Sequence, residues 1–289
     1  MSKHILVTGA NGQLGNEMRN ILANRNDVVA YFTDVNELDI TSKDAIGSFL
    51  DNHQVDYLVN CAAYTAVDKA EDAPELCALL NAHAVALLAQ AAHKHGARMV
   101  QISTDYVFNG ENFRPYREND ATCPVSVYGS TKLEGERLLL SIAPESVILR
   151  TAWLYSPYGH NFVKTMIKLG QEKDQLKVIF DQVGTPTYAK DLAGAIMLII
   201  DAPTWHSGTY HFSDEGAISW YDFAMAIHRL AGIDTCTVQP CRTDEYPTRA
   251  HRPHYSVLDK SKFKATFNTV IPYWADSLAD CIARIKHDK

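Results

Sequence analysis

The chain reads Val7-Thr8-Gly9-Ala10-Asn11-Gly12-Gln13-Leu14-Gly15 near its start, where an apolar run gives way to a helical pattern. Gly9 permits a tight turn, Gly12 lets a pyrophosphate approach the backbone, and Gly15 lets a helix pack closely on a strand. The spacing is one residue wider than the common dinucleotide fingerprint, so an ordinary glycine turn is the alternative. Because the turn lies at the first strand–helix junction, we expect a dinucleotide site at the start of that helix.

Apolar runs and helical patterns alternate through the first half of the chain. The expected strands are His4–Thr8, Asp27–Phe32, Tyr57–Ala62, Arg98–Ser103 and Val147–Arg150. The expected helices are Gly12–Asn24, Ser42–Asn52, Pro74–His95 and Val127–Ile142. This succession predicts an α/β fold, a doubly wound parallel sheet of the Rossmann type with helices on both faces.

After Arg150 the pattern changes to loops rich in Pro, Tyr and His between helices. We expect helices at Asn161–Gln171, Tyr188–Ile200, Trp220–Leu230 and Pro272–Ile285. Residues 1–153 with about 176–203 are expected to form the dinucleotide-binding domain. About 154–175 with 204–289 are expected to form a smaller substrate-binding lobe over the carboxyl edge of the sheet, where such folds bind ligands.

Composition narrows the functional classes. The net charge of −7 argues against a nucleic-acid partner or an anionic membrane surface, both of which need a basic patch. The longest apolar stretch, 193–200, is too short to cross a bilayer, and the N-terminus lacks a signal-peptide pattern. Six cysteines at irregular spacings suggest reduced thiols. We therefore expect a cytoplasmic protein.

Loops that follow the predicted strands supply further candidates for the cofactor site. Asp34 follows the second strand, where an acid can accept hydrogen bonds from a ribose 2′-hydroxyl, which favours NADH over NADPH. Asp at a strand end is also a common turn residue. Asp39-Ile40 and Ala62-Ala63-Tyr64 would flank the cofactor in the same way, with turn and packing roles as the alternative.

Tyr128 and Lys132 are four residues apart on a predicted helix, so both side chains share one face. A phenol has a pKa of about 10, and an ammonium beside it would lower that value and make a better proton donor. Thr104 ends the fourth strand, where its hydroxyl could donate to a substrate carbonyl. Asp105 could bind substrate or cap a helix. These residues predict reduction of a ketone by hydride.

With these motifs in place, the chain resembles the extended short-chain dehydrogenase/reductases, and among them the dTDP-4-dehydrorhamnose reductases. The matching segments are the glycine-rich stretch 7–15, Asn60–Glu71, Ile102–Gly110, Tyr128–Glu136, Leu149–Tyr155, Asn161–Val163, Asp181–Thr187 and Arg252-Pro253. They follow one another in order over nearly the whole chain.

The resemblance implies reduction of the 4-keto group of dTDP-4-dehydro-L-rhamnose with NADPH or NADH. It implies Thr104, Tyr128 and Lys132 as the catalytic set, with Tyr128 and Lys132 also at the cofactor. Asp105, Trp153 and Arg252 would join Thr104 and Tyr128 at the nucleotide-sugar. The remaining cofactor residues would be Asn11, Gln13 and Leu14 of the glycine turn.

Two questions of assembly and two other functions stay open at this stage. Some members of the family are dimers with a divalent ion at the interface, so a homodimer is allowed. Lys190 is a poor neighbour for a cation near Glu17, and we expect no required metal. The alternative functions are a dinucleotide-binding regulatory subunit of methionine adenosyltransferase, and a reductase or epimerase for another nucleotide-sugar.

Overall fold

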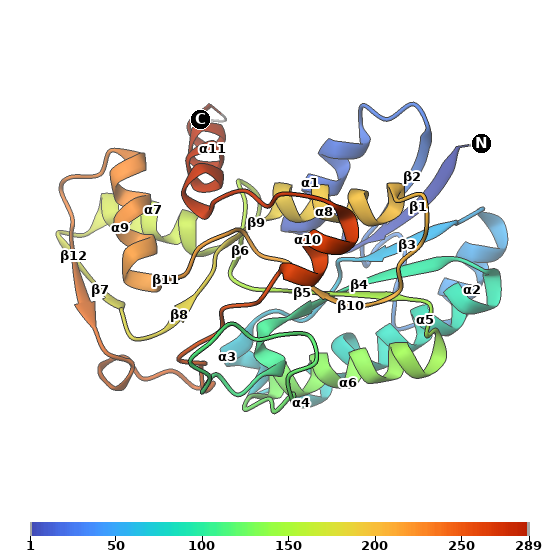
Figure 1. Ribbon diagram of the computed structural model, residues 1–289, viewed down its shortest axis with the longest axis horizontal. Coiled ribbons are helices and arrows are strands. Elements are labelled where there is room, and N and C mark those ends of the chain that lie inside the picture. Colours follow the sequence, from blue (N-terminus) through green and yellow to red (C-terminus); the bar gives the residue numbers. More distant parts are fainter. Residues whose placement is uncertain (1, 288–289) are drawn as a thin grey trace.

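The computed structural model describes residues 2–287 of the chain. Its larger part is built on a sheet of six parallel strands in the order β2-β1-β3-β4-β5-β10 (Figure 1). The strands are β1 Lys3–Thr8, β2 Val28–Thr33, β3 Tyr57–Asn60, β4 Arg98–Thr104, β5 Val147–Thr151 and β10 Gly208–His211. The first five lie where the sequence predicts strands, and the fold class is confirmed.

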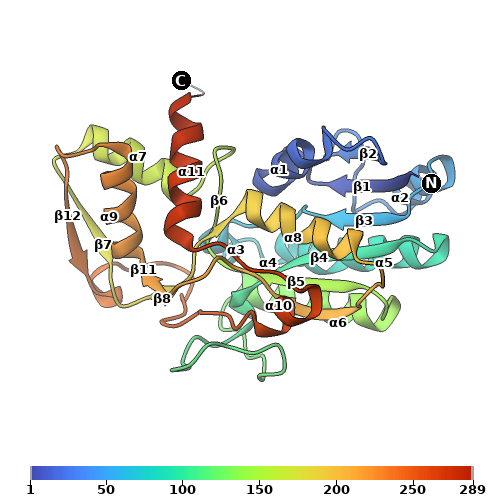
Figure 2. The same cartoon turned by 45° about the horizontal axis from the view of Figure 1, so that its top comes forward.

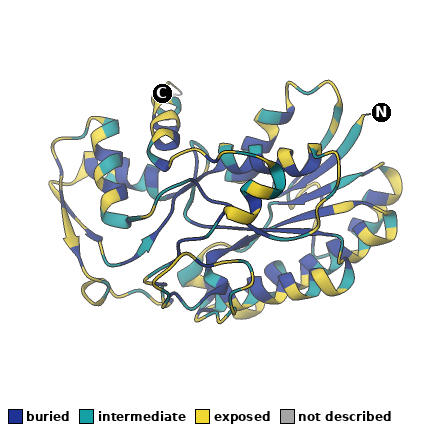
Figure 3. Ribbon diagram, viewed as in Figure 1, coloured by how far each residue is buried: buried dark blue, intermediate teal, exposed yellow. Residues whose placement is uncertain are grey.

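Helices cover both faces of this sheet (Figure 2). Side chains alternate along each strand, so Ile5 and Val7 enter one core and Leu6 enters the other, all three fully buried. The first core is closed by α1 Gln13–Leu22, α8 Ala189–Asp201 and α10 Ser261–Phe267. The second is closed by α2 Lys43–Asn52, α5 Ala84–His95 and α6 Val127–Ile142. Figure 3 shows the strands between these layers largely in the buried class.

The predicted helix Pro74–His95 forms in three parts, α4 Pro74–Ala78, the π-helical turn η1 Leu79–His83, and α5. By length and composition this helix could cross a bilayer. A core helix passes the same test, and α5 buries Val85, Leu88 and Ala92 against the sheet. Its apolar character therefore has an explanation inside the fold.

The smaller lobe combines three helices with short two-stranded pairings around a core of its own. Its helices are α7 Phe162–Glu172, α9 Trp220–Ala231 and α11 Trp274–His287. Its strand pairs are β7 Gln175–Ile179 with β12 Thr237–Cys241, β8 Val183–Gly184 with β11 Ile218–Ser219, and β6 Leu154–Tyr155 with β9 Thr187–Tyr188. Short turns complete the chain at α3 Val67–Ala70, η2 Asp105–Val107 and η3 Thr243–Glu245.

Two strand pairings cross the predicted domain boundaries. β10 pairs with β5 at the edge of the large sheet, and Phe263 of α10 packs into the same core, although both segments were assigned to the smaller lobe. β7 pairs with β12 in the smaller lobe, although 176–203 was assigned to the larger domain. β10 is only four residues long and half polar, so it carries no apolar run that a sequence analysis could recognise as a strand. We propose the domain division that follows these pairings.

Candidate active site

A cavity of about 740 Å³ lies between the carboxyl ends of the large sheet's strands and the smaller lobe. The predicted site residues that line it are Gly9, Gly12, Gln13, Leu14, Asp34, Asp39, Ile40, Ala62, Ala63, Thr104, Asp105, Tyr128, Lys132, Trp153 and Arg252. Three others, Asn11, Gly15 and Tyr64, lie outside the lining. The volume suits a small-molecule site, and the position is the one that open parallel sheets use for ligands.

The glycine turn holds backbone where side chains would collide. Gly9 has a φ of +62°, and a Cβ there would stand 2.6 Å from the backbone nitrogen of Ala62. Gly12 is the N-cap of α1 and offers no side-chain cap, so the first turn of the helix is open to an anion. A Cβ on Gly15 would stand 2.5 Å from Cα of Ala10, so this glycine serves close packing of the helix. This cradle fits the pyrophosphate of a dinucleotide.

The part of the cavity wall that follows β2 is acidic. Asp34, just after β2, accepts hydrogen bonds from the N–H groups of Asn11 at 3.0 Å and Val35 at 2.9 Å. Asn11 therefore braces Asp34 instead of lining the cavity. Asp39 and Ile40 continue the same wall.

The loop after β3 is held from behind by Asn81 of the π-helical turn. Its side chain accepts from the Tyr64 N–H at 2.9 Å and donates to the Tyr64 carbonyl at 3.1 Å. These two bonds position Ala62 and Ala63 at the cavity. Tyr64 contributes its backbone to the support of the loop.

Tyr128 and Lys132 face the cavity from the start of α6. The helix begins here because Ser126 accepts the N–H of Gly129 at 3.1 Å and Glu71 accepts the N–H of Val127 at 2.9 Å. One turn on from Tyr128, Nζ of the buried Lys132 donates to the carbonyl of Ile102 on β4 at 2.6 Å. Both predicted residues therefore reach one region of the cavity.

Burial dominates the acid–base properties of this pair. It lowers the pKa of Lys132 to about 8, against the opposing influence of the Glu136 carboxylate. It raises the pKa of Tyr128 above its ordinary value, and a hydrogen bond with Thr104 offsets only part of the increase. The lowering expected from Lys132 together with a bound oxidised nicotinamide stays a prediction, since without the cofactor desolvation of the phenolate is the largest effect. Tyr128 is fully protonated at neutral pH and can act as a proton donor.

Thr104 and Asp105 lie side by side at the end of β4. The Thr104 hydroxyl donates to Oδ1 of Asp105 at 2.9 Å and accepts the N–H of Tyr106 at 3.2 Å. Oδ2 of Asp105 is buried without a partner among the described residues. Burial raises the pKa of this carboxyl to about 6, with hydrogen bonds from Thr104 and Ser256 acting the other way. Because Asp105 lines the cavity, its carboxylate is a candidate acceptor for the hydroxyl of a sugar.

Trp153 forms the wall on the side of the smaller lobe. Its backbone has a φ of +49°, a conformation that costs energy in a residue with a side chain. Its ring stacks on that of Trp220 with centroids 3.5 Å apart. Gly184 leaves the space for this indole, since a Cβ there would stand 2.6 Å from Cε2 of Trp153. The rigid aromatic pair presents a flat surface to the ligand.

Arg252 is tied to the larger domain although it belongs to the C-terminal part of the chain. Its Nη2 lies 2.6 Å from Oδ2 of Asp68 in α3. The other oxygen of Asp68 accepts the N–H of Ala250 at 3.2 Å. The fork geometry of a guanidinium leaves donors for a diphosphate at the cavity mouth.

Sequence reasoning missed part of the wall. The loop residues Gly159, His160 and Asn161 and the aromatic Trp220 also line the cavity. Asn161 carried a signal, because it belongs to a recognised segment and caps α7 by accepting the N–H of Lys164 at 3.1 Å. No sequence signal identified Trp220, since a tryptophan at the start of a helix usually packs in the hydrophobic core.

Comparison with known proteins shows the family of the chain. The family described as RmlD substrate binding domain matches residues 3–287. A curated protein of Aggregatibacter actinomycetemcomitans named dTDP-4-dehydrorhamnose reductase is 41% identical, over 95% of this chain and 96% of its own length. The chain belongs to this reductase family.

Solved structures of the family share the whole fold. A dTDP-4-dehydrorhamnose reductase from Clostridium acetobutylicum is 47% identical with a TM-score of 0.94, covering 98% of this chain and 99% of that one. One from Bacillus anthracis, solved in complex with NADP, is 36% identical with a TM-score of 0.94, covering 98% of this chain and 100% of that one. The Bacillus anthracis reductase thus binds NADP on this architecture.

The two residues considered for a metal site, Glu17 and Lys190, each form an ion pair with a residue of α11. Glu17 is paired with Arg284, and Lys190 with Asp280. Within residues 2–287, no group of three or more His, Cys, Asp or Glu side chains could hold a metal ion. The absence of a required metal stays a prediction.

Proposed function

We propose that the protein reduces the 4-keto group of dTDP-4-dehydro-L-rhamnose to give dTDP-L-rhamnose, with NADPH or NADH as the hydride source. One observation carries the proposal: Thr104, Tyr128 and Lys132 line the same cavity as the glycine turn that can hold a dinucleotide. The names of the matched relatives support the same activity.

The chain's own residues can perform the remaining chemistry. The bound nicotinamide supplies the hydride. Tyr128 is protonated and donates its proton to the oxygen of the reduced carbonyl, while Thr104 stabilises the negative charge that develops there. Lys132 lines the same cavity, where its positive charge favours the phenolate that Tyr128 becomes, and its Nζ is held by the Ile102 carbonyl. Asp105 accepts from a sugar hydroxyl, Trp153 packs against the sugar, and Arg252 binds the diphosphate.

The test is Tyr128→Phe, with oxidation of the reduced nicotinamide followed by absorbance in the presence of dTDP-4-dehydro-L-rhamnose. Loss of the proton donor is expected to lower kcat by about 10²- to 10⁴-fold while cofactor binding is retained. The exposed Tyr246, changed to Phe, is the matched control. Turnover by Tyr128→Phe at the rate of the control would refute the assignment.

The same assay separates the other functions. The regulatory subunit of methionine adenosyltransferase finds no support in the relatives reported above, which are named dTDP-4-dehydrorhamnose reductase. An epimerase would return the hydride to its substrate and show no net cofactor oxidation. A reductase for another nucleotide-sugar would turn over that sugar faster than dTDP-4-dehydro-L-rhamnose. Location in the cytoplasm, a homodimer and the absence of nucleic-acid or membrane partners stay predictions.

A further inference from the structure

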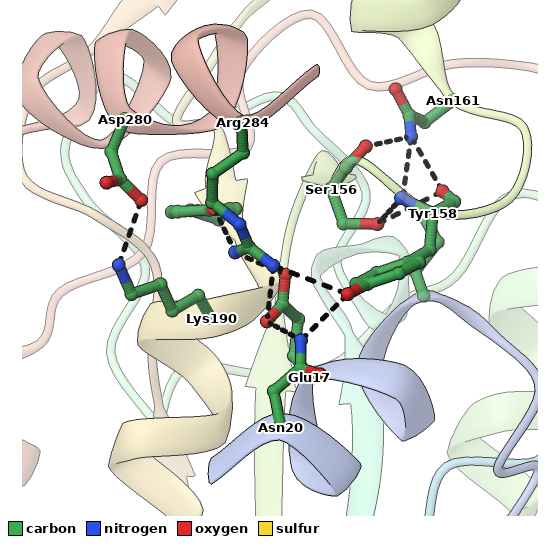
Figure 4. Close-up of polar contacts among 10 residues, drawn as sticks. Glu17, Asn20, Ser156, Tyr158, Asn161, Lys190, Asp280 and Arg284 are labelled. Carbon is green, nitrogen blue, oxygen red and sulfur yellow. Dashed lines mark hydrogen bonds and ion pairs between the residues drawn. The ribbon is translucent and has the colours of Figure 1, made fainter. Parts of the chain in front are cut away.

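A partly buried polar cluster lies between the first helix, the C-terminal helix and the loop 156–161 (Figure 4). Glu17 of α1 is 2% exposed, so its charge needs a partner. Arg284 of α11 supplies it, with Nη1 at 2.8 Å from Oε1 of Glu17. The same nitrogen donates to the hydroxyl of Tyr188 in β9, directly before α8. This contact joins the two ends of the chain.

From this ion pair the cluster extends to Tyr158 in the loop. Nδ2 of Asn20 donates both to Oε2 of Glu17 at 3.1 Å and to the Tyr158 hydroxyl at 2.9 Å. Nη2 of Arg284 lies 3.5 Å from the same hydroxyl. The guanidinium carbon stands 5.9 Å from the centre of the Tyr158 ring, within reach of a cation–π interaction. The tip of the Tyr158 side chain is therefore anchored by α1 and α11.

The backbone of the loop is anchored at its other side to the glycine turn. Ser156 Oγ and Asn161 Nδ2 both donate to Oε1 of Gln13, at 3.1 Å and 2.9 Å. Gly159 has a φ of +60°, and a Cβ there would stand 3.4 Å from Cγ of Gln13. Gly159 and Asn161 line the cavity beside Gly12 and Gln13. The loop is thus the outer wall of the part of the cavity where a pyrophosphate would lie.

We propose that Arg284 and Tyr158 are positioning residues for the cofactor, and that helix α11 holds the loop 156–161 closed against the glycine turn. The inference rests on the proposed function only for the identity of the dinucleotide. Neither side chain is among the residues that line the cavity, so both act through the loop. A loosened loop opens the outer wall and lets the dinucleotide leave faster, whereas the carbonyl site around Tyr128 is untouched.

The test is direct binding of NADPH and of NADH without any sugar, by quenching of tryptophan fluorescence, with dissociation followed in a stopped-flow instrument. Tyr158→Phe removes one hydroxyl and leaves the Glu17–Arg284 pair. It is expected to raise the Kd by about threefold to tenfold through faster dissociation, as for a lost hydrogen bond. In the turnover assay, KM for the cofactor should rise. At saturating cofactor, kcat should not fall and KM for the keto-sugar should not rise.

Lys190→Met is the matched control, because Lys190 pairs with Asp280 between α8 and α11 at 2.9 Å without touching the loop. It should bind both dinucleotides like the unchanged protein. Arg284→Met removes the guanidinium that holds Tyr158 and leaves the Glu17 carboxylate without its partner. If this variant unfolds, the double variant Arg284→Met with Glu17→Gln removes the unpaired charge. The proposal would be overturned if Tyr158→Phe and the folded Arg284 variant bound the dinucleotides with the same Kd as Lys190→Met. Because no sugar is present, this result is independent of the reductase assay.

Discussion

Arg150 and Glu136 form a buried ion pair on the same face of α6 as Tyr128 and Lys132, with Nη2 of Arg150 at 2.6 Å and Nε at 2.9 Å from the two carboxylate oxygens. Ser103 on β4 also donates to this carboxylate. Glu136 lies one turn beyond Lys132, and Arg150 belongs to β5. The pair therefore fixes the helix that carries Tyr128 and Lys132 to two strands of the sheet.

Glu136→Gln should be strongly destabilising, because it keeps the shape of the side chain but leaves the Arg150 charge buried without a counter-charge. Removal of one partner of a buried pair costs about 3–5 kcal/mol. The measurement is the free energy of unfolding from urea denaturation. Glu172→Gln is the control, since Glu172 is exposed and its nitrogen partner on Lys168 is 3.9 Å away; its loss should be below about 0.5 kcal/mol. Equal losses in the two variants would contradict the structural role given to the pair.

The pH dependence of kcat/KM should have two limbs. Asp105 takes up a proton as the pH falls through about 6 and then loses its role as an acceptor. Lys132 loses its proton as the pH rises through about 8 and then no longer supplies a positive charge. Activity is therefore expected to be highest between these values and to decline on both sides.

Asp105→Asn assigns the acid limb. The variant should be slower, yet its kcat/KM should stay level as the pH falls through about 6, because the group that titrates there is gone. The basic limb should remain. An acid limb that persists unchanged in the variant would show that another group titrates.

The sequence was sufficient for the elements whose signal is local. The buried strands β1 to β5 are apolar runs, and α6 begins and ends at the predicted residues Val127 and Ile142. The turn 9–15 could be recognised because glycine spacing and position act together. In each case the sequence pattern that predicts the element lies within the residues that form it.

The features that could not be predicted from the sequence depend on contacts between distant segments. β10 becomes a strand only because β5 offers an edge, and its own residues Gly208–His211 are too few and too polar to show it. The pKa of Tyr128 rises because of burial that only the packed fold creates. Trp220 joins the wall because Trp153, 67 positions earlier by the numbering, adopts a left-handed backbone and stacks on it.

Asp34 should make the protein favour NADH. Its carboxylate is held at the cavity wall by the N–H groups of Asn11 and Val35, so it cannot easily turn away from a 2′-phosphate. Asp34→Ala is expected to raise the ratio of kcat/KM for NADPH to that for NADH by about tenfold, or about 1.4 kcal/mol. Asp44→Ala, at an exposed position of α2, removes the same charge away from the cavity and should leave the ratio unchanged. Equal ratios in the two variants would remove Asp34 from cofactor selection.

Gly184→Ala should weaken binding of the nucleotide-sugar without affecting the cofactor. The added methyl group would stand 2.6 Å from Cε2 of Trp153 and 2.7 Å from Oγ of Ser256, so the indole must shift off the Trp220 ring. We expect KM for the keto-sugar to rise by about tenfold, since a loss of about 1.4 kcal/mol is typical of a disturbed aromatic contact. Gly194→Ala in α8 is the matched control, because a Cβ there meets nothing within 4 Å. That change should leave KM unaltered and raise the free energy of unfolding by about 0.5–1 kcal/mol, as alanine favours a helix interior over glycine. If Gly184→Ala retains the KM of Gly194→Ala, Trp153 does not contact the sugar.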